Sequence, residues 1–327
     1  MKKLKKHRFL RFWSIATALA ATAALATACS SAKGAQSSSS DVELHHLTIA
    51  AVPAADSAGL YIAAEDGLFA AQGIHVKIEP AVSSETVIGQ QLHGKYAITS
   101  GSYVSYMLAN VKQHANFEIL AAGSIMQPQV QELMIAPGSQ IRSVDDLRGK
   151  TIALNAFNGI GQLLVSATLT ANMISPSQVH FTTINFPQMT QALQEHKVAA
   201  AFMPQPFATN AEDKIGAQPL ADLDQGAVTS LPISGYVVTK SWLQKYPKTA
   251  AAFRKALEEA QRIADTNPGA VEKAMVQYSK VSPTAAAITA SPQFPLDTDR
   301  VLIQRVADLM QEFGLLHQSY NVSPMIP

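Results

Sequence analysis

The chain has 327 residues, of which 47% are hydrophobic and 15% are charged, and its formal net charge is +1. Six of its 25 Lys and Arg residues lie within the first 11 positions, so only 19 remain to face 24 Asp and Glu residues. This mildly acidic body lacks the basic face that nucleic-acid binding requires, and its length is sufficient for two hydrophobic cores.

Residues 1–28 predict a secretory signal peptide. A basic head precedes an apolar run over 12–28, which is too short and too sharply ended for a membrane-spanning helix. Small residues at 26–28 lead directly to Cys29, the only cysteine of the chain. This arrangement resembles a bacterial lipobox, in which the cysteine is acylated. Because the motif's leucine stands one position early, at Leu25, a plain signal peptide with an unmodified Cys29 is the alternative.

Residues 29–45 are expected to form a flexible tether between this lipid site and the body. The segment 30–40 reads SSAKGAQSSSS and offers nothing to a core. A lipid on Cys29 would leave no thiol for a disulfide, so the fold must be stabilised by its cores.

The body alternates strand and helix patterns, which indicates parallel sheets covered by helices on both faces. The expected strands are 46–52, 75–79, 96–99, 117–122, 131–136, 151–155, 180–184, 198–203 and 233–239. The expected helices are 58–66, 85–92, 102–113, 159–171, 187–196, one that opens at Pro206, and an almost wholly helical segment over 241–314.

Local signals punctuate these elements. Gly67 is expected as a left-handed helix cap, and Gly73 and Gly149 as further turns at element ends. Ser143 begins a one-turn helix as its N-cap, with Asp146 three residues on as the reciprocal partner.

Five stretches occur in a characteristic order: LYIAAEDGLF at 60–69, GIHV at 73–76, IRSVDDLRGKTIA at 141–153, ALQEHKVAAAFMPQP at 192–206, and a helix start with Trp-Leu and Tyr-Pro at 242–247. Together they resemble the nitrate-, sulfonate- and taurine-type substrate-binding proteins of ABC importers. That family also includes binders of thiamine pyrimidine precursors. The resemblance extends from about Leu47 to the C-terminus.

The resemblance implies an α/β fold: a type II periplasmic-binding-protein-like clamshell of two doubly wound lobes with the ligand between them. Lobe one would be 46–135 plus 238–327 and lobe two 136–237, with crossings near 135–137 and 236–238. It also implies an extracytoplasmic monomer, anchored to the membrane by Cys29, that delivers a small molecule to an ABC permease without catalysis.

Four strand-to-helix junctions would line such a cleft, at 53–58, 100–102, 155–161 and 204–206, because ligands of open α/β sheets lie beyond the carboxyl ends of the strands. The helix N-termini there present free N–H groups and a positive dipole end, which bind anions without a cationic side chain. The candidate ligand-binding residues are Asp56, Ser57, Ser100, Gly101, Ser102, Asn155, Phe157, Asn158 and Gln205.

Several of these residues have a structural alternative. Ser102 and Asn158 are equally compatible with N-caps of their own helices, and Phe157 with a core position. Tyr103 and Tyr106 offer flat rings to a ligand, but their three-residue spacing on one helix is more typical of core packing.

Asp56 leaves the charge of the ligand open. A carboxylate beside a small bare anion repels it, so a small heterocycle such as a pyrimidine fits as well as an alkanesulfonate or taurine-like anion.

Two rivals share the fold: a pyrimidine-synthase-like enzyme that uses a pyridoxal cofactor as substrate, and a surface sensor without a permease. A dinucleotide fingerprint fails at Leu164, phosphate-loop and protease motifs are absent from the sequence, and its histidines are scattered. We therefore expect no catalytic residue, no cofactor and no metal site.

Overall fold

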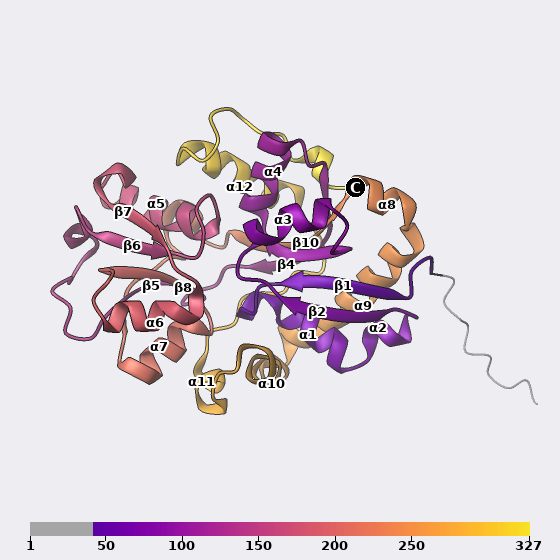
Figure 1. The fold of residues 1–327 in the computed structure, drawn as a ribbon, viewed down its shortest axis with the longest axis horizontal. Helices are drawn as coiled ribbons and strands as arrows, with labels where there is room; N and C mark the ends of the chain where they lie inside the picture. The colour runs from indigo at the N-terminus through magenta and orange to yellow at the C-terminus, as the bar shows by residue number, and fades with distance from the viewer. Residues whose placement is uncertain (1–41) are drawn as a thin grey trace, which may run out of the picture. The chain divides into compact units, whose positions relative to one another are not determined.

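The computed structural model describes residues 42–327 (Figure 1). The signal peptide, the candidate lipid site at Cys29 and the tether as far as residue 41 lie outside the described residues. Residues 42–45, expected as the end of the tether, instead contact the body. Glu43 accepts hydrogen bonds from the backbone N–H groups of Lys248 and Thr249 at 3.0 and 2.7 Å, and Leu44 packs against buried hydrophobic residues.

The first sheet contains five strands in the order β2-β1-β3-β10-β4. Their bounds are β1 (His46–Ala51), β2 (His75–Pro80), β3 (Ile98–Ser102), β4 (Phe117–Ile125) and β10 (Pro232–Thr239). Strand β1 is parallel to β2 and β3, whereas β10 is antiparallel to both β3 and β4.

The second sheet has the order β7-β6-β8-β5-β9. Its strands are β5 (Gln131–Ile135), β6 (Thr151–Leu154), β7 (His180–Thr183), β8 (Ala200–Pro204) and β9 (Gln218–Asp222). Strand β6 is parallel to β7 and β8, and β5 is antiparallel to β8 and β9. Both sheets are therefore mixed, and the expectation of purely parallel sheets was wrong. Strand direction is invisible in an apolar run when both faces of the strand are buried.

The chain changes sheets at positions that differ from the expected crossings. The first connection is 126–130, between β4 and β5, and the second is 223–231, between β9 and β10. Residues 131–135 thus join the second sheet and 232–237 the first, the reverse of the expected assignment. The sequence marks these segments as strands but does not encode which sheet each one joins.

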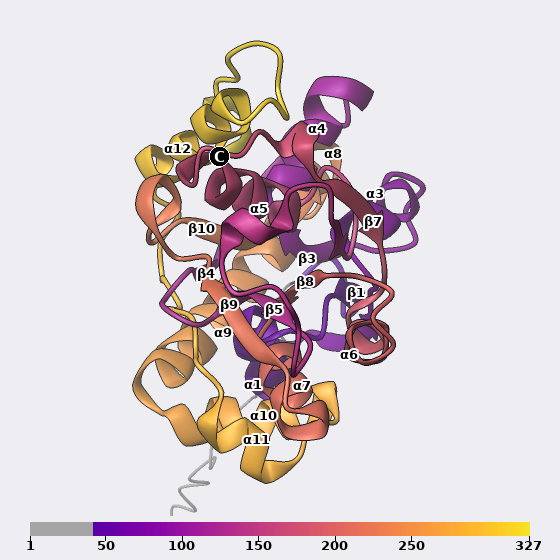
Figure 2. The ribbon, with the colours of Figure 1, turned by 90° about the vertical axis from the view of Figure 1, so that its left-hand side faces the viewer.

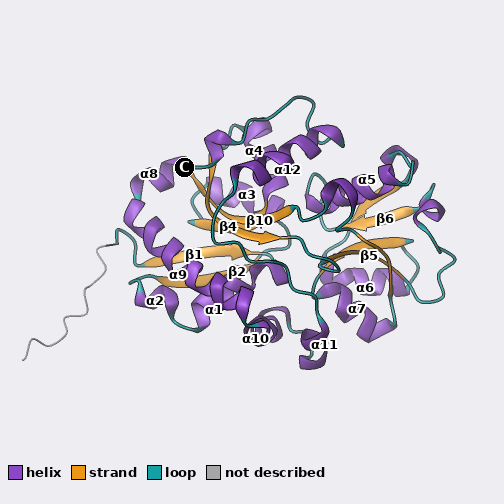
Figure 3. Ribbon diagram, turned by 180° about the vertical axis from the view of Figure 1, so that it is seen from behind, coloured by secondary structure: helices purple, strands orange, loops and turns teal. Residues whose placement is uncertain are grey.

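Helices cover both faces of each sheet, as the alternating pattern predicted. They are α1 (Ala58–Glu65), α2 (Leu68–Ala71), α3 (Ser84–Leu92), α4 (Tyr103–Gln113), α5 (Ile160–Ala171), α6 (Phe186–Gln194), α7 (Phe207–Ile215), α8 (Lys240–Lys245), α9 (Pro247–Thr266), α10 (Pro268–Ser279), α11 (Pro283–Ile288) and α12 (Arg300–Glu312). On the first sheet, α3, α4 and α12 lie on one side and α1, α2 and α9 on the other (Figures 1 and 3). On the second, α5 lies opposite α6 and α7 (Figure 2). The segment 289–299 interrupts the expected C-terminal helical run, and β9 was not anticipated.

The local signals that bound these elements behave as the sequence indicated. Gly67, Gly73 and Gly149 all adopt left-handed φ values, between 70° and 79°. Ser143 and Asp146 form a reciprocal capping box around a single 3₁₀ turn. Within the described range, no helix combines the length and apolar character needed to cross a membrane.

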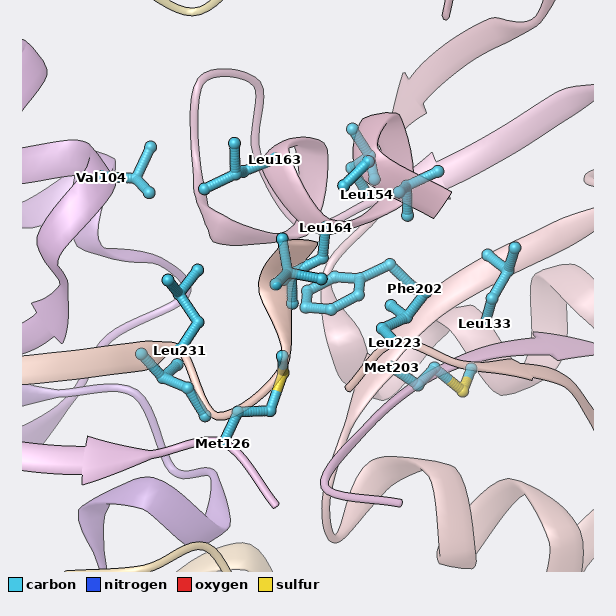
Figure 4. Packing of buried hydrophobic residues seen from close by; sticks show 14 of the residues in the cluster. Val104, Met126, Leu133, Leu154, Leu163, Leu164, Phe202, Met203, Leu223 and Leu231 are labelled. Atoms are coloured by element: carbon cyan, nitrogen blue, oxygen red, sulfur yellow. The ribbon is translucent and has the colours of Figure 1, made fainter. Parts of the chain in front are cut away.

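The buried hydrophobic residues do not divide into one core per sheet. One cluster lies between the first sheet and α1, α9 and α10. A larger one joins residues of α4 and α12 to the whole second sheet. Met126 and Leu231, from the two connections, belong to this second cluster together with Leu164 and Phe202 (Figure 4). The connections contribute their few apolar side chains to this cluster, which therefore continues from one sheet to the other.

Candidate functional site

A cavity of about 50 Å³ lies where the carboxyl ends of β1, β3, β6 and β8 face one another. The first-sheet side contributes Val52, Ala54, Asp56, Ser57, Ser84, Glu85, Ser100, Gly101, Ser102 and Ile233. The second-sheet side contributes Gln131, Asn155, Gly159, Ile160, Phe186, Phe202 and Pro204. All four junctions singled out from the sequence therefore supply part of the wall.

Six of the nine candidate residues line this cavity: Asp56, Ser57, Ser100, Gly101, Ser102 and Asn155. Phe157, Asn158 and Gln205 do not belong to its lining. The agreement does not follow the distance from the strand end. Gln205 directly follows β8 and is not part of the lining, whereas Asp56 and Ser57 belong to it although they lie further beyond the end of β1.

Phe157 and Asn158 lie in a neighbouring hollow of about 250 Å³ between the β6–α5 loop and helices α3 and α4. The Phe157 side chain is 47% exposed, so neither the ligand-contact nor the core alternative describes it. Asn158 has a left-handed φ of 60°, and its N–H donates to Gln162 Oε1 at 2.8 Å. The N-cap of α5 is Gly159, so Asn158 does not cap the helix either.

The Gln205 side chain makes its hydrogen bonds within the half of the protein that is built on the second sheet. Its Oε1 accepts hydrogen bonds from the backbone N–H and the hydroxyl of Thr209, at 3.2 and 2.9 Å. Its Nε2 donates to the Gln129 carbonyl at 3.0 Å. Its backbone carbonyl contacts the first sheet's half of the protein, where it accepts the N–H of Ala55 at 2.8 Å.

Two of the candidate hydroxyls have structural partners. Ser57 Oγ donates to the Val52 carbonyl at 2.8 Å. Ser102 Oγ accepts the N–H of Val104 at 3.2 Å and is the N-cap of α4, which confirms the capping alternative. A β-carbon on Gly101 would lie 2.2 Å from Ser84 Oγ, which itself accepts the Ser102 N–H at 2.9 Å. The backbone here approaches α3 too closely for any side chain.

Tyr103 and Tyr106 are core residues. Both are at most 1% exposed and belong to the larger hydrophobic cluster. The Tyr106 hydroxyl shares a 2.6 Å hydrogen bond with Thr99, and the Tyr103 ring fills the space where Gly235 lacks a β-carbon. Neither ring lines the cavity, and their burial agrees with the core-packing alternative.

Three polar atoms of the cavity wall are buried without a hydrogen-bond partner among the described residues. They are Asp56 Oδ1, Ser100 Oγ and Gln131 Oε1. Buried polar groups are nearly always paired, and an unpaired one costs about 1–3 kcal/mol. Their concentration at one cavity marks it as the candidate binding site.

Burial raises the pKa of the Asp56 carboxyl from 3.8 to about 6, against a smaller opposing effect of the Ser234 hydroxyl. The side chain loses water on the inner face of the β1–α1 junction, and no cation lines the cavity to compensate. Glu85 is the second carboxylate of the wall, and it accepts a hydrogen bond from the Ser105 hydroxyl.

The sequence reasoning missed several lining residues. Ser84 and Glu85 follow β2 at a fifth strand-to-helix junction, so the rule applied to the other four junctions would have found them. Gln131 is the first residue of β5 and carried no signal, because β5 was assigned to the wrong sheet. Phe186 and Phe202, whose ring centroids are 5.9 Å apart, form an apolar wall that only the packing reveals.

A family model described as "NMT1/THI5 like" matches residues 54–271. The chain is 25% identical over 239 residues to the taurine-binding periplasmic protein of Escherichia coli K12, covering 65% of this chain and 74% of that protein.

Solved structures with similar folds include the alkanesulfonate-binding protein SsuA of Xanthomonas axonopodis pv. citri bound to MOPS. Its TM-score is 0.75 at 16% identity, over 87% of this chain and 99% of that one. A Candida albicans protein described as having the generic periplasmic binding protein fold gives a TM-score of 0.72 at 13% identity, over 87% of this chain and 96% of that one. The chain thus has the periplasmic-binding-protein fold and belongs to the NMT1/THI5-like family.

Proposed function

We propose that this chain is the substrate-binding component of an ABC importer, which captures a small solute between two lobes and hands it to a membrane permease. Each lobe would be built on one of the two sheets. The observation that carries the proposal is the cavity whose wall comes from strand-to-helix junctions of both sheets and contains unpartnered polar atoms. The family match and the taurine-binding relative support it.

Capture requires the lobes to separate. A cavity of about 50 Å³ is far below the 300–1,000 Å³ typical of small-molecule sites, so a solute enters only when the two halves move apart. The two connections are the natural hinge, because they alone carry the backbone between the sheets. They are joined to each other by a hydrogen bond from Met126 N–H to the Leu231 carbonyl, at 2.9 Å.

Closure on a solute would follow from contacts available only when both halves meet. Residues of both sheets line the cavity, and a backbone hydrogen bond between Ala55 and Gln205 joins the two halves beside it. A ligand that contacts both walls binds the closed form better than the open one and shifts the population toward it. No bond is made or broken in this mechanism.

We place the solute among small sulfonates or small nitrogen heterocycles. The wall offers the N-terminus of α5 at Gly159 and Ile160, the amide side chains of Asn155 and Gln131, and the aromatic edge of Phe186. Amide groups bind oxyanions and heterocycle edges, and the apolar residues fit a short carbon body.

Binding is tested by calorimetry and thermal shift on the mature protein, with taurine, ethanesulfonate, nitrate and 4-amino-2-methylpyrimidine. A saturable response to at least one compound is expected, with a rise in Tm that grows with ligand concentration. The test variant is Asn155→Ala, which removes an amide side chain from the cavity wall and should weaken the response. If none of the four compounds gives a calorimetric response or a rise in Tm, the proposed solute classes are wrong.

The membrane attachment has its own test. If Cys29 is acylated, the mature protein should partition into detergent, and Cys29→Ser should release it into the aqueous fraction with its fold unchanged. Recovery of the wild-type protein in the aqueous fraction would show that the cysteine is not lipidated.

A further inference from the structure

The wall of the cavity carries negative charge and no positive charge. Its ionisable residues are Asp56 and Glu85, and no Lys, Arg or His side chain lines it. In a small, poorly solvated space, two carboxylates repel an anion more strongly than they would in water. A solute whose only charge is negative therefore meets an unfavourable field.

The candidate anion site of the sequence analysis, the N-terminus of α5, already has a carboxylate beside it. A β-carbon placed on Gly159, the N-cap of that helix, would lie 2.8 Å from Glu85 Oε1. Glu85 reaches it from α3, on the opposite side of the cavity. The positive end of the α5 dipole is thus partly neutralised by the protein itself.

The unpartnered atoms of the wall point to the complementary chemistry. Asp56 Oδ1 and Gln131 Oε1 accept hydrogen bonds and cannot donate them, and the Ser100 hydroxyl accepts as readily as it donates. Ser100 and Gln131 are 1% and 3% exposed. The Tyr236 hydroxyl beside Ser100 is also without a partner in the described part of the chain. The Ser234 hydroxyl acts on the Asp56 carboxyl. A ligand group with N–H donors would satisfy the acceptors that remain.

These acceptors are distributed over both halves of the protein. Asp56 follows β1 and Ser100 lies in β3, both of the first sheet, whereas Gln131 begins β5 of the second. A donor group held by all of them would be bound only when the cavity is closed. This donor group of the ligand would therefore serve both for recognition and for stabilising the closed form.

We infer that the solute carries a donor nitrogen, as an ammonium or an amino group on a heterocycle, and that Asp56, Ser100 and Gln131 receive it. This inference rests on the proposed solute-binding function and narrows its substrate class. An unmodified alkanesulfonate or nitrate lacks the recognised group. An aminosulfonate and an aminopyrimidine both contain it.

The test uses matched ligands that differ in this group alone. Taurine, isethionate and ethanesulfonate carry an ammonium, a hydroxyl and a hydrogen on the same carbon of one sulfonate skeleton. 4-Amino-2-methylpyrimidine and 2-methylpyrimidine form the second pair. Calorimetry on the mature protein is expected to show at least tenfold tighter binding of the amine in whichever series binds, with isethionate between its two relatives.

Variants assign the preference to named atoms. Asp56→Asn keeps the size of the side chain and removes its charge, so it should reduce the tenfold preference to threefold or less. Gln131→Leu removes an acceptor from the opposite wall and should lower the preference less. Asp213→Asn, on the exposed face of α7, should leave it unchanged.

The possible outcomes separate the solute-binding function from the donor-nitrogen inference. If an amine-free ligand binds as tightly as its amine partner, the donor-nitrogen inference is wrong while the solute-binding function stands. If the preference survives in Asp56→Asn, the assignment to Asp56 is wrong. If none of the five ligands binds, the proposed solute classes fail and the inference fails with them. The wild-type comparison decides the question even if a variant does not fold.

Discussion

Ala55 donates its backbone N–H to the carbonyl of Gln205, with 2.8 Å between the nitrogen and the oxygen. Ala55 follows β1 of the first sheet and Gln205 follows β8 of the second, so this hydrogen bond joins the two halves of the protein beside the cavity. It joins two of the junctions that the sequence singled out. Its loss should therefore act on closure and leave each half intact.

Ala55→Pro removes this one donor and is compatible with the local backbone. The residue opens a 3₁₀ turn, and Ala54 before it has the extended conformation (φ −109°, ψ 168°) that proline favours in its predecessor. One lost hydrogen bond of about 1 kcal/mol should weaken ligand binding about fivefold. Calorimetry with the best ligand measures this, with Ala55→Gly, which keeps the N–H, as the control. Equal losses in both variants would contradict the role of the hydrogen bond.

Asp56→Asn should raise the thermal stability of the ligand-free protein at neutral pH. Burial raises the folded-state pKa of this carboxyl from 3.8 to about 6, so its ionised form is the costly one. Its favourable contribution is complete below about pH 4 and is lost as the pH rises through about 6. The Tm advantage of the variant should grow over that interval, by a difference on the order of 1–3 kcal/mol in unfolding free energy.

Scanning fluorimetry from pH 4 to 8 measures this difference, with Asp213→Asn as the exposed control. Glu85 and the buried Tyr236, Tyr61 and Tyr278 are the ionisable groups around Asp56. The tyrosine pKa values are all raised, so these side chains stay neutral over this interval. A pH-independent Tm difference would show that Asp56 does not titrate there.

Gly161→Ala should destabilise the second sheet's half of the protein. A β-carbon at this position would lie 2.3 Å from the Phe202 ring, and Phe202 is 1% exposed. Overpacking of this kind costs about 1–3 kcal/mol. Urea denaturation measures the change, and Gly89→Ala is a matched control, because nothing lies within 4 Å of its β-carbon position in α3. A Gly161→Ala protein as stable as the wild type would mean that Phe202 moves aside without cost.

Glu43→Gln should loosen residues 42–45 from the start of α9. Burial opposes ionisation of this carboxyl, but the hydrogen bonds from Lys248 and Thr249 together outweigh it and lower the pKa from 4.5 to about 2. The attachment is therefore complete above about pH 4.5 and is lost as the pH falls through about 2. Limited proteolysis and amide exchange at pH 7 should show faster cleavage and exchange at 42–45 in the variant. Rates equal to those of the wild type would mean that the other contacts of residues 42–45 hold the segment without Glu43.

The fold class was predictable because alternation of apolar strands with helices is local information. Gly67 and the Ser143–Asp146 capping box marked element ends, and the structure confirms both. The sheet assignments of β5 and β10 were not predictable, since a strand buried on both faces reads the same in either sheet and either direction.

The candidate site was also predictable only in part. Ser100 lies near the end of β3 and Asn155 directly follows β6, and both line the cavity, as the rule for open sheets indicated. Asp56 lines it from a 3₁₀ turn further along the β1–α1 junction. Phe157, Asn158 and Gln205 miss it, because the direction of a side chain in a loop depends on contacts made elsewhere. The Gln205 amide group forms hydrogen bonds with Thr209 and Gln129, and the sequence pattern does not reveal these partners.

The sequence by itself determined most of the secondary structure and several of the residues at its boundaries, because these depend on side chains only a few positions apart. Only the tertiary structure decided which polar atoms of the cavity lack partners. Hydrogen-bond satisfaction is a property of residues far apart in the chain, as Asp56, Ser100 and Gln131 are. Their shared lack of donors exists only once the two sheets face each other.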